Sequence, residues 1–145
     1  MDIRTEYTDF VRHATDNPGH EPYEYQHRLA AGGLPELLAV PTGCGKTAAV
    51  VLGWLFRRRA HPDRAVRATT PHWLVYLLPQ RVLVEQTEGV INEWLVNTGL
   101  DVKCHVVMGG QRGSTWRHDL DRAAILVGTQ DMLLSRALNR GYGDT

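Results

Sequence analysis

The chain has 145 residues, of which 43% are hydrophobic and 22% are charged, and this composition predicts a soluble protein with one domain core. Its 16 Lys and Arg residues balance its 16 Asp and Glu residues, which excludes an overall electrostatic attraction to nucleic acid or membranes. Any contact with a polyanion must therefore be local.

We find no signal-peptide pattern and no apolar run near the roughly 18 residues of a membrane span, so we expect a cytoplasmic protein.

The cysteines and histidines predict neither disulfides nor a metal site. Cys44 and Cys104 are too few and too differently placed for a disulfide framework, and the seven histidines show no zinc spacing with them. We expect reduced thiols and no structural metal.

Two short helices are expected in the first third of the chain. Helical spacing of apolar residues predicts a packing helix over residues 5–15, so that residues 1–21 form this helix and a linker. Pro22 opens a second helix that stops at Gly32 and Gly33. Gln26 lies on it, and its spacing alone indicates an exposed residue.

A glycine-rich segment, residues 40–47, lies between the apolar run 37–40, which we expect to be a buried parallel strand, and a predicted helix over residues 46–59. Gly43 and Gly45 allow a tight turn with inward N–H groups, to which the helix N-terminus adds its positive dipole end. Such a turn binds a polyphosphate. The full pattern asks for Gly at Val40, so the first turn should be wider than in a kinase-type loop.

This phosphate-binding loop predicts a nucleotide site with Mg²⁺. Lys46 would reach the β- and γ-phosphates, and the Thr47 hydroxyl would coordinate a Mg²⁺ that bridges them. The contacting residues would be Pro41, Thr42, Gly43, Cys44, Gly45, Lys46 and Thr47. A plain glycine-rich turn with a surface lysine is the alternative.

Helices and strands alternate after the loop. The cations of residues 57–59 should be a solvated helix cap, and residues 60–71 a loop. Buried strands are expected at residues 73–78, 102–108 and 123–127, with helices at residues 82–97 and 132–138. This alternation predicts an α/β fold with a parallel sheet, helices on both faces, and the ligand at the carboxyl ends of the strands.

The ordered motifs of the chain resemble those of superfamily 2 helicases, with a RecA-like first lobe. They comprise Gln26, residues 41–47, Pro79-Gln80-Arg81 with Gln86-Thr87, Gly109-Gly110 and Gly128-Thr129-Gln130. The stretches 22–30 and 126–142 further resemble the CRISPR-associated helicase-nuclease of type I systems, which unwinds and degrades DNA marked by a guide complex. The resemblance covers about residues 20–143.

The resemblance implies roles for individual residues. Gln26 would read the adenine edge, and Gly43 to Thr47 would hold ATP and Mg²⁺. Arg81, Gly110 and Thr129 would touch the phosphate backbone of a single strand, which positions it without reading its sequence. The implied partners are single-stranded DNA and a guide-RNA surveillance complex. The chain departs at Gln80 and Gln130, where many members have Thr and Pro.

Catalytic residues cannot be assigned. Phosphoryl transfer needs an acidic pair at a strand end and an arginine near the developing charge. In the family the Asp-Glu strand follows shortly after the position of residues 141–143, and this chain stops at Thr145. We expect residues 22–145 to be a partial helicase ATP-binding domain, truncated before that strand, that lacks hydrolysis on its own. A small P-loop kinase and a non-catalytic nucleotide-binding module are the alternatives.

Overall fold

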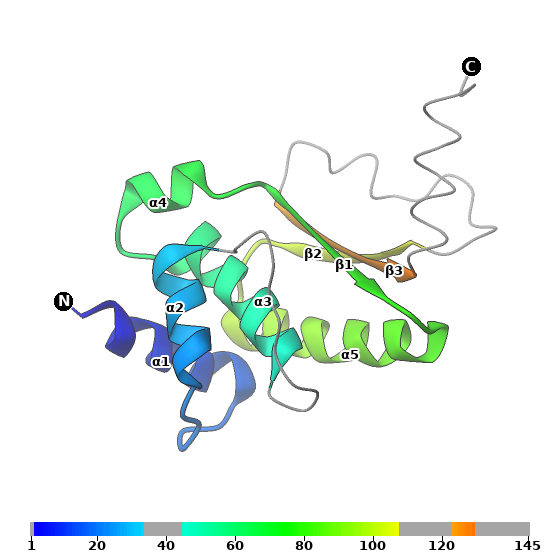
Figure 1. The fold of residues 1–145 in the computed structure, drawn as a ribbon, viewed down its shortest axis with the longest axis horizontal. Helices are drawn as coiled ribbons and strands as arrows, with labels where there is room; N and C mark the ends of the chain where they lie inside the picture. The colour runs from blue at the N-terminus through cyan, green and yellow to red at the C-terminus, as the bar shows by residue number, and fades with distance from the viewer. Residues whose placement is uncertain (1, 34–44, 108–122, 130–145) are drawn as a thin grey trace. The chain divides into compact units, whose positions relative to one another are not determined.

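The structure, a computed structural model, describes residues 2–33, 45–107 and 123–129. In chain order the elements are α1 (Ile3–Thr15), α2 (Glu24–Gly32), α3 (Lys46–Leu55), η1 (Phe56–Ala60), α4 (Arg64–Thr69), β1 (Trp73–Leu78), α5 (Arg81–Thr98), β2 (Lys103–Val107) and β3 (Ala124–Thr129) (Figure 1). They form two compact units. Unit 1 comprises Met1–His72 and Glu93–Asp101, and unit 2 comprises Trp73–Asn92 and Val102–Thr145.

Helix α1 confirms the first predicted helix and forms one side of the core of unit 1. It begins where the Asp2 side chain accepts a hydrogen bond from the Arg4 amide at 3.2 Å, and its apolar stripe is buried. The Tyr7 ring meets Phe56 edge-on at 5.3 Å and His27 at 5.7 Å between ring centroids. These contacts join α1, α2 and η1 around one aromatic cluster.

Arginines tie the helices of unit 1 together, contrary to the solvated cap expected for residues 57–59. Arg57 donates hydrogen bonds to the carbonyls of Ala30 and Ala31, at 3.0 and 2.8 Å. Arg57 therefore satisfies backbone carbonyls in the last turn of α2. It does not cap the end of its own helix. Of the three arginines only Arg59 is exposed. Sequence alone cannot show this, because the carbonyls lie 26 and 27 residues away.

Helix α4 was not expected, because residues 60–71 read as a loop. Pro62 and Asp63 are turn residues, but here they begin a helix: the Asp63 carboxylate accepts a hydrogen bond from the Ala65 amide at 2.9 Å. The residues that follow Asp63 include good helix formers, Arg and Ala. The loop interpretation gave the turn residues too much weight.

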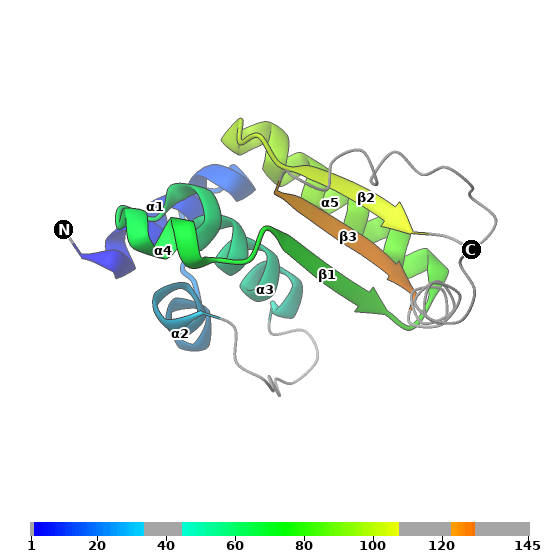
Figure 2. The same cartoon turned by 90° about the horizontal axis from the view of Figure 1, so that it is seen from above.

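Unit 2 is built on a parallel sheet with the strand order β1-β3-β2. Strand β3 is central and buried, and its residues Ala124 and Thr129 align with Trp73 and Leu78 of β1. The structure thus confirms the parallel α/β class. Seen from two sides, the part of α5 up to Asn92 runs along one face of this sheet (Figures 1 and 2).

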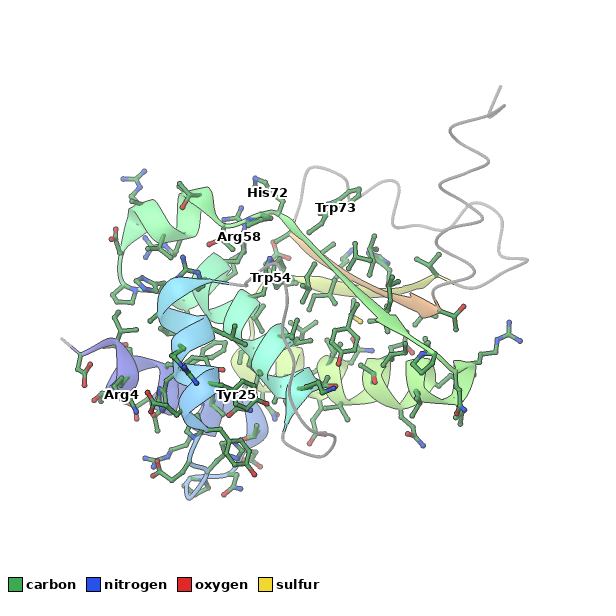
Figure 3. All side chains as sticks on the ribbon, viewed as in Figure 1. Arg4, Tyr25, Trp54, Arg58, His72 and Trp73 are labelled. Carbon is green, nitrogen blue, oxygen red and sulfur yellow. The ribbon has the colours of Figure 1, made fainter. Side chains whose placement is uncertain are left out.

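The other face of the sheet is partly exposed. Trp73 points away from α5 (Figure 3), and Val75 and Leu77, which follow it on the same face, are 48% and 46% exposed. The expectation of a fully buried strand at residues 73–78 is therefore wrong for this face of the described sheet. The strand expected at residues 37–40 and the helix at 132–138 lie outside the described residues.

Candidate functional site

The described end of the phosphate-binding loop is the start of α3. Gly45 is the N-cap residue in the left-handed conformation, with φ +73°, and its carbonyl accepts the first helical hydrogen bond from Ala49 at 2.9 Å. Among the described residues no side chain caps this end of α3, and its first turn holds no acidic residue. The first turn of a helix has N–H groups without intrahelical partners and carries the positive dipole end. This helix start is therefore electrostatically suited to an anion.

Gln26 lies against the same glycine. Its Nε2 donates to the Gly45 carbonyl at 3.0 Å, and its Oε1 accepts from the Tyr23 amide at 2.8 Å. Only 3% of the residue is exposed, so the exposed position indicated by its spacing is wrong. The reason is tertiary: α2 packs beside α3 (Figure 1), which brings the Gln26 side chain against Gly45.

A side chain at position 45 would have to displace the Gln26 amide. A Cβ on Gly45 would lie 2.7 Å from Gln26 Nε2, and the positive φ is itself strained for any other residue. The conformation of Gly45 thus requires glycine, and the contact with Gln26 adds to the cost of replacing it.

Tyr23 is a site residue that sequence reasoning missed. It is 55% exposed, and its Cε2 lies 3.8 Å from the Cβ position of Gly45. Its ring lies nearly parallel to that of Tyr25, with centroids 6.1 Å apart and an interplanar angle of 18°. The available signal was an aromatic residue three positions before Gln26. A large exposed ring beside a buried amide is suited to stack on a planar ligand.

The second group of predicted residues gathers at the carboxyl edge of the sheet in unit 2. Thr129, the last residue of β3, aligns with Leu78, the last residue of β1. The chain then turns at Gln80, whose carbonyl accepts from the amides of Leu83 and Val84, and α5 begins at the exposed Arg81. Thr129 thus ends one strand, and Arg81 closely follows the end of the neighbouring strand.

Several predicted residues lie outside the described part of the chain. They are Pro41, Thr42, Gly43, Cys44 and Gly110. Among residues 2–33, 45–107 and 123–129, no group of three His, Cys, Asp or Glu side chains is arranged to hold a metal ion. No helix of these ranges is long and apolar enough to cross a bilayer.

Comparisons with known proteins agree with this arrangement of motifs. The family model of the DEAD/DEAH box helicases matches residues 26–143, beginning at Gln26 and including the start of α3 and all three strands. No curated protein and no solved structure matches the chain. With most of its length matched, the chain belongs to the DEAD/DEAH box helicase family, whose members are ATP-dependent enzymes of the helicase type.

Proposed function

We propose that the chain is the ATP-binding portion of an ATP-dependent nucleic-acid helicase or translocase. The observation that carries this is the start of α3, where an obligatory glycine, an exposed Lys46 and Thr47 stand at an uncapped helix end beside Gln26. Lys46 would pair with the β- and γ-phosphates of ATP, and Thr47 would hold the Mg²⁺ that bridges them. Residues 41–44 would complete the loop.

Gln26 and Tyr23 are the proposed contacts for the base. A side-chain amide has two N–H donors and two acceptor sites, so Gln26 keeps one of each after its bonds to Gly45 and Tyr23. One donor and one acceptor match the edge of adenine, and guanine presents the reverse pattern at its exocyclic group. Tyr23 would stack on the ring and add affinity without distinguishing the two bases.

Nucleic acid is the proposed second ligand. The phosphate backbone of a single strand, preferably DNA, would contact Arg81, Thr129 and Gly110. Support comes from the register of β1 and β3, in which Thr129 ends one strand and Arg81 closely follows the end of its neighbour. Such contacts hold a strand of any sequence, as a translocating motor requires.

We propose that the chain belongs to the CRISPR-associated DNA helicase of a type I system. The support is the resemblance of residues 22–30 and 126–142 to that helicase. It would act in antiviral defence in the cytoplasm, recruited by a guide-RNA surveillance complex. Residues 22–145 would be its partial ATP-binding domain, and residues 1–21 a packing helix and linker.

Calorimetric titration with Mg-ATP tests the nucleotide site. Lys46→Ala should lower ATP affinity by about 10- to 100-fold or more, because a charged hydrogen-bonding partner of the phosphates is lost. Lys103→Ala removes the other lysine, on β2, and is the matched control. Equal affinities for wild type and Lys46→Ala would refute the site. Hydrolysis measured with and without single-stranded DNA then separates a motor from a binding module.

Salt-dependent DNA binding tests the strand contact. Arg81→Ala should weaken binding to single-stranded DNA and lower the salt slope by about 0.7, the value for one phosphate contact, at unchanged ATP affinity. A parallel loss of both affinities would indicate a folding defect and would count against this role.

A further inference from the structure

The positive charge of this neutral chain is concentrated on one short segment. Residues 57–72 contain five arginines and a single acidic residue, Asp63, and therefore carry a net charge of +4, although the whole chain carries zero. Four of these arginines and a histidine belong to η1, α4 and the residue before β1. We call Arg58, Arg59, Arg64, Arg67 and His72 the arginine patch.

The core of the arginine patch is held in place by backbone groups. Arg58 donates to the Arg67 carbonyl at 2.8 Å, and its other terminal nitrogen lies 2.8 Å from His72 Nδ1 (Figure 3). Arg67 in turn donates to the His61 carbonyl. The two guanidinium groups are therefore fixed before any ligand arrives, which reduces the entropy lost on binding.

These anchors leave the charge uncompensated. Backbone carbonyls satisfy N–H groups but bring no full negative charge. Within the described residues the ion pairs join Arg4 to Glu24 and Arg12 to Glu21, and no member of the arginine patch takes part in one.

Arg58 shows the cost of this arrangement most directly. Its Nε is buried and has no hydrogen-bond partner among the described residues. Burial, with the nearby Arg59, lowers the pKa of its guanidinium. A partly buried cation without a counter-ion is destabilised, and a bound anion would relieve that penalty.

We propose that the arginine patch is a second surface for the phosphate backbone of nucleic acid. Arginine forks match phosphate oxygens. Two exposed arginines, Arg59 and Arg64, beside the half-buried Arg58 and Arg67 on neighbouring elements suit a repeating polyanion better than a single small anion. The surface lies at the far end of the helix that begins at Lys46 and continues through η1 to Ala60, roughly 20 Å from the nucleotide site. It therefore adds to the contacts proposed for Arg81 and Thr129. This inference rests on the proposed function in one respect: that function is the reason for choosing nucleic acid rather than an acidic protein segment as the ligand.

Exposed residues give variants that should fold. Arg59 and Arg64 are exposed, so Arg59→Gln/Arg64→Gln removes two charges without disturbing the anchored Arg58 and Arg67. Arg28→Gln removes an exposed arginine from α2 and is the control. The probes are a fluorescein-labelled DNA single strand and the matching duplex, measured by anisotropy over a salt series, with thermal melting to confirm the fold.

The double variant should bind nucleic acid more weakly and show a shallower salt dependence. Loss of two phosphate contacts lowers the slope by about 1.4 for the single strand or about 1.8 for the duplex. The probe that wild type binds more tightly at the same salt concentration is the preferred form. Arg64→Glu should weaken binding further, and Arg28→Gln should leave the slope unchanged.

Three results would overturn the proposal. One is an unchanged slope in the double variant and in Arg64→Glu, although wild type binds. Another is a polyglutamate peptide that displaces the DNA more effectively than unlabelled DNA does, which would identify an acidic protein partner. The third is absence of nucleic-acid binding by wild type. If wild type binds no nucleic acid but still binds ATP in a way that depends on Lys46, the proposed nucleotide site is supported and the role of the arginine patch is refuted.

Discussion

At Gln26 the two ends of one amide serve different parts of the chain, since Oε1 holds the Tyr23 amide and Nε2 holds the Gly45 carbonyl. Gln26→Glu keeps the acceptor and removes the donor. We expect ATP affinity to fall by about tenfold, because the Gly45 carbonyl loses the Gln26 donor and keeps only the Ala49 amide, at a cost of about 1–3 kcal/mol. The preference for ATP over GTP should fall as well.

Calorimetry with both nucleotides on Gln26→Glu checks this, with Gln86→Glu, an exposed glutamine of α5, as the control. An unchanged ratio of the affinities for ATP and GTP would show that Gln26 has a structural role and does not read the base.

Cys104 of β2 should be an unreactive thiol. Burial, and to a smaller extent the charge of Glu88, raises its pKa to about 12, so almost no thiolate forms at neutral pH. Brief iodoacetamide treatment followed by mass spectrometry should leave Cys104 unlabelled in the native protein and label it fully in denaturant. Comparable labelling in both states would show that the β2 thiol is accessible.

Among the elements, α2 is held near both ends by hydrogen bonds of side chains. One side chain belongs to α2 itself, and the other comes from η1. Gln26 binds Gly45 near the start of α2, and Arg57 binds the carbonyls of Ala30 and Ala31 at its end. Arg57→Met should lower the free energy of unfolding by about 1–2 kcal/mol, because these carbonyls lose charged donors. Chemical denaturation measures this, and Arg59→Met is the matched exposed control. Equal effects of the two substitutions would assign no special role to the Arg57 contact.

Local patterns in the sequence predicted most of the described elements. The spacing of Tyr7, Val11 and Ala14 indicates α1 because one stripe of that helix is buried, and the apolar run of β3 indicates a central strand because both of its faces are covered. Such patterns fail where a residue is fixed by a distant partner.

The site residues show that limit. The glycines, Lys46 and Thr47 can be proposed as site residues from spacing alone, because the loop is local in sequence. The burial of Gln26 could not, because its partner Gly45 is 19 residues away. The capping role of Asp63 was missed for another reason, since the same residue favours both a turn and a helix start.

At the scale of the whole molecule, two buried histidines link folding to pH. His27 and His61 are 7% and 5% exposed and both contact the aromatic cluster of Tyr7 and Phe56. Burial lowers the pKa of each, helped by Arg4 at His27 and by Arg57 at His61.

The groups around each histidine act in both directions. Asp2, Glu21 and Glu24 partly oppose the shift at His27. At His61, Asp63 opposes it and Arg67 adds to it. Burial is the largest cause at both residues.

The sign of the pH effect follows from these lowered pKa values. The unfolded chain, with histidine near its ordinary pKa of about 6.5, binds more protons than the folded one, so stability rises with pH in this range. We therefore expect the melting temperature to fall as the pH is lowered from about 8 through about 6.

Thermal melting followed by circular dichroism over that range checks this. His27→Gln should flatten the dependence, and His13→Gln, which alters an exposed histidine of α1, should not. Identical pH profiles for wild type and His27→Gln would contradict a role for His27.

The close approach of Gln26 to Gly45 also fixes an order of events in evolution. A lineage that first gains a side chain at position 45 meets both the strained backbone and the Gln26 amide, whereas one that first shortens residue 26 meets neither. Relatives that lack the glutamine but keep the glycine should therefore exist, and relatives with the reverse combination should be absent. An alignment of the family can be read for that asymmetry.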